Sequence, residues 1–385
     1  MIRAGTGLAR GQADDAAIEA SLRAVEEAGG SGGPLAFVFA TVPGPLAHGA
    51  LHAVRRVTGA RAVVGCSGGG VLTGQGEVEG EPAVAVALLR GEGIEVAPFC
   101  LHGLGPEGQD IGLALAEAFT TARPPTLLAL LPDVRGLNPS ALLGGLERLR
   151  PGLPVVGGVA AGSPPYECFE TEVVEGALVG AALAGVEAVI GVAQGCEPIG
   201  EPYVVTQAEE HVVYRIGGRP ALEVLREAIL ALDNPQERLQ RGGVFAGLAV
   251  DPAKSPLGRG DYLVRNIVGM DQPSGAVAVA EQVRVGQTIQ FQLRDDASAR
   301  EDLRAMLDRV ARDLGGRRPA LGLYFNCLGR GVGLYGQPDH DVGLIRERLG
   351  AFPLIGFFGN GELAPVGRRN FLHTYTGALA LLLPA

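Results

Sequence analysis

Lysine is almost missing from this sequence, and arginine carries nearly all of the positive charge. Lys254 is the only lysine in 385 residues, so a Schiff-base or phosphate-binding lysine has a single candidate. The formal net charge is −10, and no run of basic residues occurs. Because proteins that bind nucleic acid neutralise phosphates with clustered Lys and Arg, we expect no nucleic-acid partner.

Cysteine is also scarce, and no C-x-x-C pair occurs. An odd number of widely spaced cysteines indicates neither a disulfide scaffold nor a zinc ribbon, and it fits a reducing cytoplasm. Residues 1–11 lack the apolar core of a signal peptide. The longest apolar stretch, residues 177–195, is interrupted by Glu187 and by glycines, which favours two buried strands over a membrane span. We therefore expect a cytoplasmic protein with no membrane partner. The five cysteines are Cys66, Cys100, Cys168, Cys196 and Cys327.

Glycine, in contrast, is abundant. The chain has 60 glycines among 385 residues, about twice the usual share of about 7%. Apolar residues make up 47% of the chain and alternate with these glycines, which excludes a disordered or collagen-like protein. The length predicts two or three domains, each large enough to bury a core.

A pattern of one strand, one helix, a second strand ending in glycine, a Gly-rich turn and a long apolar strand occurs three times. The copies span residues 35–89, 126–183 and 320–383, and their second strands end at Gly65, Gly157 and Gly356. We interpret each copy as a right-handed β-α-β unit followed by an antiparallel return strand. The sequence therefore predicts an α/β fold of layered mixed sheets, built from repeated β-α-β-β units in two domains.

The region between the second and third copies follows another pattern. It predicts a hairpin over residues 203–216, a helix over 219–232, four strands between 243 and 293, and a helix over 297–314. Gly217 and Gly218 are the predicted joint between two domains, residues 31–216 and 217–385. Residues 1–30 are expected to form a helix and a linker.

Candidate binding residues follow from the direction of the strands. Loops that leave the carboxyl ends of parallel strands lie at the same edge of a sheet, where open α/β folds bind ligands. The third copy offers a cation, an anion, two amides and a thiol there, a combination suited to a zwitterionic small molecule. Alternatively, Arg330 and Glu362 pair with each other and the glycines only form tight turns. The candidate ligand-binding residues are Asn326, Cys327, Arg330, Gly331, Asn360, Gly361, Glu362, Cys66 and Ser67.

Several stretches resemble the FIST domain family, the F-box and intracellular signal transduction proteins. They are residues 63–67, 194–200, 216–222, 285–295, 326–331 and 355–362. The resemblance implies a FIST N-terminal domain over 31–216, a FIST C-terminal domain over 217–385, and a bacterial sensory module for which amino acids have been proposed as ligands. It supplies no catalytic residues. Because no F-box, kinase or cyclase segment occurs in this sequence, we expect the output to pass to a separate signalling protein.

Three local motifs suggest other chemistries, and a fourth suggests a helix cap. Residues 331–336 match the dinucleotide pattern G-x-G-x-x-G, which this glycine content produces about once by chance. Residues 65–69 match the hydrolase pattern G-x-S-x-G, but no helix is predicted after them. His48 and His52 have the spacing of zinc ligands without a third ligand. Residues 339–341 are predicted to cap a helix.

Three functions remain open at this point. The leading hypothesis is a sensor that binds a small polar metabolite, with Arg330 on its carboxylate and Asn360 or Glu362 on its amine, without cofactor, metal or catalysis. The second is a protein-interaction scaffold or adaptor without a ligand. The third is a thiol or serine hydrolase-type enzyme that uses Cys327 or Ser67.

Overall fold

The computed structural model describes residues 2–102, 111–133, 135, 138–251 and 253–385. They form two compact units, unit 1 (Met1–Val192 and Met306–Ala385) and unit 2 (Ala193–Ala305). Unit 1 contains all three copies of the repeat, and unit 2 is inserted in the chain before the third copy. Gly217 and Gly218, the predicted domain joint, lie inside unit 2.

Unit 1 consists of three repeats that are longer than the sequence pattern indicated. The first repeat contains β1 (Arg3–Arg10), α1 (Ala13–Glu27), β2 (Gly33–Ala40), α2 (Gly44–Thr58), β3 (Ala60–Ser67), β4 (Gly70–Thr73), β5 (Gly76–Glu79) and β6 (Ala83–Arg90). The second contains β7 (Glu95–Leu101), α3 (Ile111–Ala118), β8 (Leu127–Pro132), α4 (Pro139–Leu149), β9 (Val155–Gly158), β10 (Glu167–Phe169), β11 (Glu172–Val174) and β12 (Leu178–Ala184). The third contains β13 (Val186–Ala193), α7 (Asp296–Leu314), β21 (Leu321–Cys327), α8 (Val332–Tyr335), α9 (His340–Leu349), β22 (Leu354–Gly359), β23 (Glu362–Val366), β24 (Arg369–His373) and β25 (Gly377–Pro384).

The predicted β-α-β-β arrangement is confirmed in every repeat. The first and second strands are parallel neighbours, and the return strand is antiparallel to the first. The prediction missed β1, β7 and α3, whereas it contained the helix α1, the strand β13 and the helix α7. Residues 1–30, expected to be a helix and a linker, also contain β1, which pairs with β6 over its whole length.

The three repeats are joined by an exchange of hairpins. The hairpin β4–β5 of the first repeat pairs with β22 of the third, β10–β11 of the second with β3 of the first, and β23–β24 of the third with β9 of the second. The resulting sheet orders are β1-β6-β2-β3-β10-β11, β7-β12-β8-β9-β23-β24 and β13-β25-β21-β22-β4-β5. Each six-stranded sheet is therefore completed by a neighbouring repeat.

The repeated glycine lies inside the second strand, one to three residues before its end, and it has a packing reason. A Cβ atom on Gly65, Gly157 or Gly356 would lie 1.7, 1.8 and 1.7 Å from the carbonyl oxygens of Val38, Leu130 and Tyr324 on the parallel first strand. Only glycine permits this approach between the two strands. The same contact recurs three times, which explains why the glycine is the most regular feature of the repeat.

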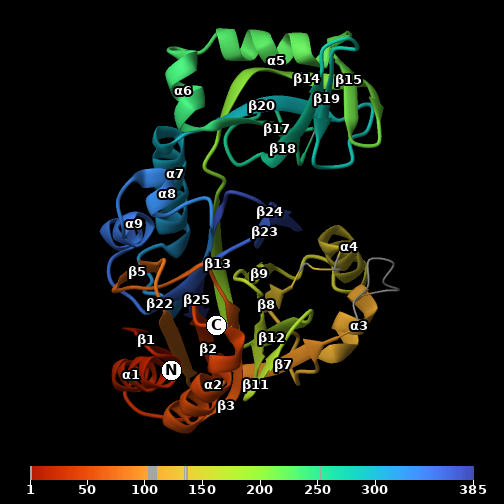
Figure 1. Ribbon diagram of the computed structural model, residues 1–385. Helices are drawn as coiled ribbons and strands as arrows, with labels where there is room; N and C mark the ends of the chain where they lie inside the picture. Colours follow the sequence, from red (N-terminus) through yellow and green to blue (C-terminus); the bar gives the residue numbers. More distant parts are fainter. Residues whose placement is uncertain (1, 103–110, 134, 136–137, 252) are drawn as a thin grey trace. The chain divides into compact units, whose positions relative to one another are not determined.

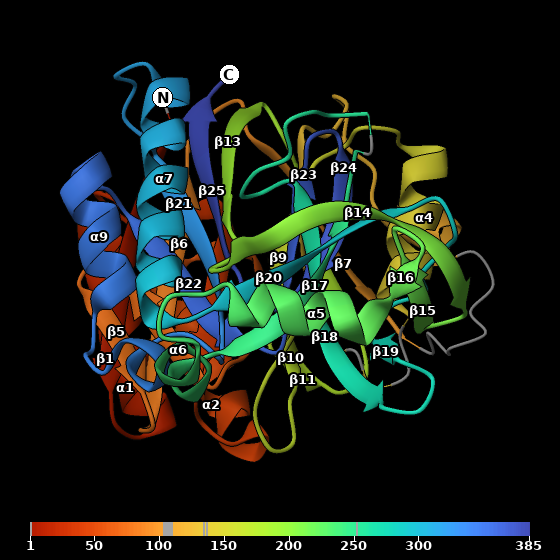
Figure 2. The same ribbon diagram turned by 90° about the horizontal axis from the view of Figure 1, so that it is seen from above.

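The main core of unit 1 lies between the inner faces of the three sheets. It contains apolar residues of all three repeats, including Phe39, Leu131 and Phe325. The helices cover the outer faces: α1 and α2 pack on the first sheet, and α3 and α4 on the second. On the third sheet, α7 and α9 lie side by side in both ribbon views and are linked by an ion pair of Arg348 with Asp308 at 3.3 Å (Figures 1 and 2).

The position after each repeated glycine lies where the three repeats meet, and it carries side chains of very different size. The three residues are Cys66, Gly158 and Phe357. The Phe357 ring lies between those of Phe39 and Phe325, with centroids 4.8 and 5.8 Å away. A Cβ on Gly158 would lie 2.7 Å from Phe357 Cζ. One large ring thus fills the centre, and glycine in the second repeat makes room for it.

Unit 2 is a closed antiparallel barrel with two whole helices and the first ten residues of α7, which continues into unit 1. Its strands are β14 (Glu197–Glu209), β15 (Val212–Ile216), β16 (Arg219–Pro220), β17 (Gly243–Ala249), β18 (Tyr262–Asp271), β19 (Ala276–Val279) and β20 (Thr288–Arg294), and its helices are α5 (Ala221–Leu230) and α6 (Pro235–Arg241). The order β14-β20-β17-β18-β19-β15 closes because β14 also pairs with β15. The predicted hairpin, strands and helices of this region are confirmed, and α6 was missed.

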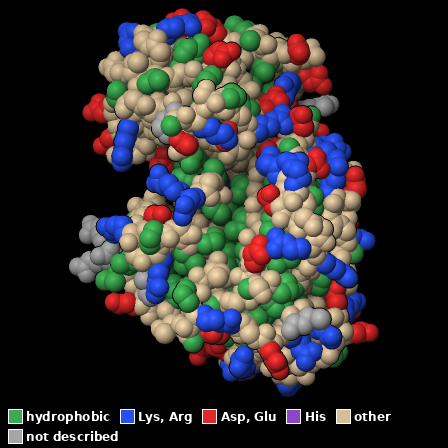
Figure 3. Space-filling view, turned by 180° about the vertical axis from the view of Figure 1, so that it is seen from behind, with side chains coloured by type: hydrophobic (Ala, Val, Ile, Leu, Met, Phe, Trp, Pro, Cys, Tyr) green, Lys and Arg blue, Asp and Glu red, His purple; other side chains and the backbone are tan. Residues whose placement is uncertain are grey.

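Two further observations concern the surface and the helices. On the face drawn in Figure 3, acidic and basic side chains are mixed and do not form a large basic area. Among the helices that the structure describes, none combines the length and apolar character that crossing a membrane requires.

Candidate functional site

The two loops of the third repeat lie together, as the strand directions predicted. β21 and β22 are parallel with Cys327 opposite Gly359, and the Leu328 N–H donates to the Gly359 carbonyl at 3.0 Å. The loops that follow β21 and β22 therefore lie at the same edge of the sheet.

Backbone hydrogen bonds bring the candidate residues of the first repeat to the same place. The Gly69 N–H donates to Phe358 O at 2.9 Å, the Ala161 N–H to Ser67 O at 3.0 Å, and the Val159 N–H to Gly361 O at 2.8 Å. The turns that follow β3, β9 and β22 thus meet in one cluster. Ser67 and Gly361 belong to this cluster directly. Asn360 is held there by its own amide, which donates to the Ala160 carbonyl at 3.0 Å.

Arg330 is completely buried, and its ion-pair partner is Asp341 of α9. Its Nε donates to Asp341 Oδ2 at 2.9 Å, and its Nη2 donates to the Tyr335 hydroxyl at 2.6 Å. The alternative that Arg330 pairs with Glu362 is wrong. Asp341 follows Arg330 by one short helix and one turn, so the loop closes on itself, whereas the Glu362 carboxylate accepts the Thr376 N–H at 3.1 Å.

Asp341 is held ionised by its neighbours. It also accepts the Tyr324 hydroxyl at 2.8 Å, and its Oδ1 lies 2.8 Å from His340 Nδ1. Burial acts to raise the pKa of Asp341, but the Arg330 charge and the hydrogen bonds from His340 and Arg330 outweigh it, so the pKa lies well below its usual value. Arg330 and Asp341 therefore form a buried ion pair within the described residues.

Two glutamates of the exchanged hairpin β4–β5 hold the helices of the third repeat. Glu77 Oε1 accepts the Val342 N–H in the first turn of α9, and Glu79 Oε1 accepts the Val332 N–H that begins α8, both at 3.0 Å. Figure 1 places β5 beside α9. Asp339, predicted to cap α9, is its N-cap residue, but its carboxylate accepts the Glu77 N–H at 2.6 Å instead. Glu77 supplies the capping carboxylate.

Glu167 occupies in the second repeat the position that Glu362 occupies in the third. Glu167 lies opposite Cys66 and accepts the Ala177 N–H at 3.3 Å, and Glu362 lies opposite Gly158 and accepts the Thr376 N–H. Both side chains are completely buried. The sequence analysis missed Glu167 because the loop before it is longer: Glu167 follows its repeated glycine by ten residues, and Glu362 follows by six.

Several buried polar atoms of this region have no hydrogen-bond partner within the described residues. Both amide atoms of Asn326 belong to this group, although the side chain is completely buried. Burying such an atom without a partner costs about 1–3 kcal/mol, so these atoms are candidates for binding a ligand. The others are Arg330 Nη1, Glu77 Oε2 and Glu167 Oε1.

The dinucleotide motif does not have the geometry that a phosphate needs. Gly331 has φ 66°, and α8 after it has only four residues. The N-terminus of α8 already holds the Glu79 carboxylate, and a Cβ on Gly331 would lie 2.4 Å from Glu79 Oε1. The glycine therefore makes room for a carboxylate of the protein itself.

The hydrolase motif also lacks the strand-to-helix turn that a nucleophile elbow requires. Ser67 ends β3 and is followed by β4, so the helix of a nucleophile elbow is replaced by a strand, as expected. Ser67 Oγ accepts the Tyr166 N–H at 2.9 Å and donates to the Tyr166 carbonyl at 3.2 Å. The hydroxyl thus links the end of β3 to the segment before β10 through two hydrogen bonds.

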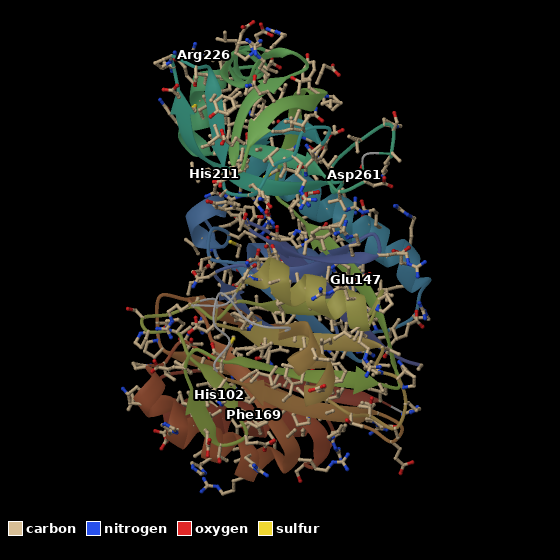
Figure 4. The ribbon with its side chains drawn as sticks, turned by 90° about the vertical axis from the view of Figure 1, so that its right-hand side faces the viewer. His102, Glu147, Phe169, His211, Arg226 and Asp261 are labelled. Carbon is tan, nitrogen blue, oxygen red and sulfur yellow. The ribbon has the colours of Figure 1, made fainter. Side chains whose placement is uncertain are left out.

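The thiols of Cys66 and Cys100 are not activated. Burial, followed by the nearby Cys168 and Glu167, raises the pKa of Cys66 well above its usual value. Cys100 Sγ lies 3.2 Å from Nε2 of His102, which Figure 4 labels, yet burial together with Glu167 and Glu172 raises the pKa of Cys100 to about 11. Cys327 is buried at the end of β21, where its N–H donates to the Thr376 carbonyl at 3.0 Å.

Two further features lie away from this cluster. His48 and His52 are exposed on α2, and no group of described residues could hold a metal ion. A shallow groove of about 460 Å³ lies at the amino ends of β8 and β9, the opposite edge from the candidate residues. It is lined by Pro124, Pro125, Thr126, Leu149, Arg150, Pro151, Gly152, Leu153 and Pro154.

The two buried glutamates predict how stability depends on pH. Burial, followed by like charge, raises the pKa of Glu77 and of Glu167 to about 8, from 4.5 in the unfolded chain. Between pH 4.5 and about pH 8, the two glutamates are protonated in the folded chain and ionised in the unfolded chain. The free energy of unfolding therefore falls as the pH rises from about 5 to 8. The slope is up to about 1.4 kcal/mol per pH unit for each group.

We therefore expect a higher thermal midpoint at pH 5.5 than at pH 8, measured by circular dichroism. Glu77→Gln and Glu167→Gln should each reduce this difference. Glu187→Gln, at an exposed ion pair with Arg317, is the control and should leave it unchanged. Equal midpoints for the wild-type protein at the two pH values would contradict the assignment.

Comparison with known families now identifies the chain. The FIST N domain matches residues 34–219, and the FIST C domain matches residues 221–365. The chain belongs to the FIST family. This FIST protein carries both domains of the family. The FIST N match ends, and the FIST C match begins, inside unit 2.

The relatives extend along the whole chain. An uncharacterized protein of Mycobacterium tuberculosis is 39% identical over 378 residues, covering 95% of this chain and 95% of its own. One of Mycobacterium bovis is 37% identical over 378 residues, covering 96% and 95%. Among solved structures, a cyanuric acid hydrolase of A. caulinodans aligns over 100% of this chain and 99% of its own, with 12% identity and a TM-score of 0.33. That similarity is too weak to relate the two proteins.

Proposed function

We propose that this FIST protein is a sensory module that binds a small polar metabolite, an amino acid or a related carboxylate, without transforming it. The observation that carries the proposal is the buried donor set beside Asp341. Arg330 Nη1 and the Asn326 amide are fully buried and have no partner within the described residues. A ligand carboxylate that accepts from both would remove a cost of about 1–3 kcal/mol for each atom.

The other candidate residues fit this proposal as walls of the site. The cluster of turns holds Ser67, Asn360 and Gly361, and Glu362 is the carboxylate proposed to meet the ligand's amine. Cys327 ends β21, Gly331 precedes α8, and Cys66 lies in β3 next to Ser67. Nη1 of Arg330 would donate to the ligand carboxylate, while Nε stays bound to Asp341 and Nη2 to Tyr335.

The absence of catalysis and the place in the cell are parts of the same proposal. The Ser67 hydroxyl is occupied by the Tyr166 backbone, and the Cys66 thiol is held in its protonated form, which supports binding over catalysis. None of the five cysteines forms a disulfide, which supports the cytoplasm. Signalling requires that the ligand prefer one conformation over another, and we propose that a separate partner detects the change.

Thermal-shift titration with a panel of amino acids and small carboxylates tests the binding function. Asn326→Leu removes the amide at nearly constant volume. Because the amide has no partner within the described residues, the variant should fold with unchanged or higher stability and lose the ligand-induced shift. Asn370→Leu is the matched control, since its amide accepts the Val155 N–H and donates to the Leu153 carbonyl at 2.9 Å each.

The two variants should behave in opposite ways. Asn370→Leu should lower the midpoint and keep the ligand-induced shift. If the whole panel leaves the wild-type midpoint unchanged, the sensor proposal fails and a scaffold without a ligand is favoured. Equal shifts in wild type and Asn326→Leu would remove Asn326 from the site.

A further inference from the structure

Glu77 belongs to the first repeat but lies in the site of the third. The hairpin β4–β5 pairs through β4 with β22 and places Glu77 at the beginning of α9, where Oε1 accepts the Val342 N–H at 3.0 Å. The side chain is 6% exposed, and Oε2 has no hydrogen-bond partner within the described residues. A buried carboxyl oxygen is thus present beside the helix that carries Asp341.

The charges around Glu77 are mostly negative. Asp339 and Asp341 face it from α9 and its N-cap, and Glu79 lies on its own strand. The other titratable groups of the cluster contact Asp341 or Arg330 and not Glu77. Arg330, Tyr324 of β21 and His340 of α9 contact Asp341, and Tyr335 of α8 contacts Arg330. Arg330 therefore balances Asp341, and no arginine or lysine is bound to Glu77 among the described residues. Burial and then Asp341 raise the pKa of Glu77 to about 8.

We propose that Glu77 is part of the ligand site of the third repeat and takes up one proton from solvent when a carboxylate binds there. This inference rests on the proposed function. The ligand brings one negative charge to Arg330, whose charge Asp341 already balances. With Glu77 protonated, the cluster of Arg330, Asp341, Glu77 and the ligand carries one excess negative charge. With Glu77 ionised it would carry two, in a region shielded from water.

The proton balance gives the direction of the effect. Below about pH 7, Glu77 already holds its proton, and binding transfers none. Above about pH 8, the ionised Glu77 must bind one proton at Oε2 as the carboxylate enters, so affinity falls with rising pH. A coupling of one pKa unit between the two charges makes this fall about tenfold.

The experiment is a titration of the protein with sodium acetate, the simplest carboxylate probe, from pH 6 to pH 9.5. Binding is followed by NMR chemical shifts, because weak affinity is sufficient for that measurement. For the wild-type protein the association constant should fall about tenfold across this range. In Glu77→Gln it should stay constant, since the amide keeps an acceptor oxygen for the Val342 N–H and does not titrate.

Glu187→Gln is the control, because Glu187 lies on β13 in an exposed ion pair with Arg317, away from the candidate residues. This variant should keep the wild-type fall in affinity. A measurement on the wild-type protein alone gives the same answer: calorimetry at pH 8.5 in two buffers of different ionisation enthalpy should report uptake of about half a proton per carboxylate bound.

The possible results separate this inference from the proposed function. If neither acetate nor the amino-acid panel binds at any pH, the proposed function fails and the inference fails with it. If acetate binds but Glu77→Gln retains the pH dependence, or the wild-type protein takes up no proton at pH 8.5, the role of Glu77 is overturned and the binding function stands.

Discussion

Replacing Asp341 with asparagine is expected to lower the free energy of unfolding of unit 1 by about 3–5 kcal/mol. The variant leaves the Arg330 guanidinium without a counter-ion in a site where both side chains are completely buried. An uncompensated buried charge is far more costly than the loss of a surface pair. The measurement is urea-induced unfolding followed by circular dichroism.

Two further variants separate the charge effect from simple loss of packing. Asp308→Asn breaks the half-exposed pair with Arg348 on the same unit and should change stability much less. The double variant Arg330→Met, Asp341→Leu removes both charges and should recover a large part of the loss. A double variant as unstable as Asp341→Asn would show that the buried charge is not the cause.

Replacing Phe357 with alanine should also cost about 3–5 kcal/mol, because it empties the place where the three repeats meet. The ring is 0% exposed and lies between Phe39 and Phe325. The neighbouring repeats hold a cysteine and a glycine at the equivalent position and cannot refill the space. The same urea measurement tests this expectation.

A double-mutant cycle makes the packing argument specific. Gly158→Ala alone should destabilise unit 1 by about 1–3 kcal/mol, since its new methyl group would lie 2.7 Å from Phe357 Cζ. In Phe357→Leu, which shortens the side chain, the same substitution should cost clearly less. Additive losses would mean that Gly158 is required for another reason.

The repeat was predictable because its cause is local in the sequence. Gly65, Gly157 and Gly356 each stand where a Cβ would collide with a carbonyl oxygen of the neighbouring strand, so the constraint leaves a glycine at the same place in every copy. The apolar strands around it are covered on both faces, which makes them continuous apolar runs. The strand directions then followed, and with them the meeting of the loops after Cys327 and Gly359.

The charge partners of the candidate site were not predictable in the same way. Arg330 and Glu362 are the obvious pair in the sequence, but Arg330 binds Asp341 of α9, which follows α8 in the chain. Glu77 reaches the same cluster from a hairpin more than 250 residues earlier in the chain. No local pattern at Glu77 indicates this, because its role arises only when β4 pairs with β22.

The sequence by itself determined the threefold β-α-β-β repeat, the separate character of the inserted region and the edge at which the candidate residues meet. These properties depend on periodicity and glycine positions within single segments. Only the tertiary structure decided which hairpin completes which sheet, which acid neutralises Arg330 and which aromatic ring fills the centre. Those choices depend on pairing and burial between segments far apart in the chain, where several partners are equally compatible with the local sequence.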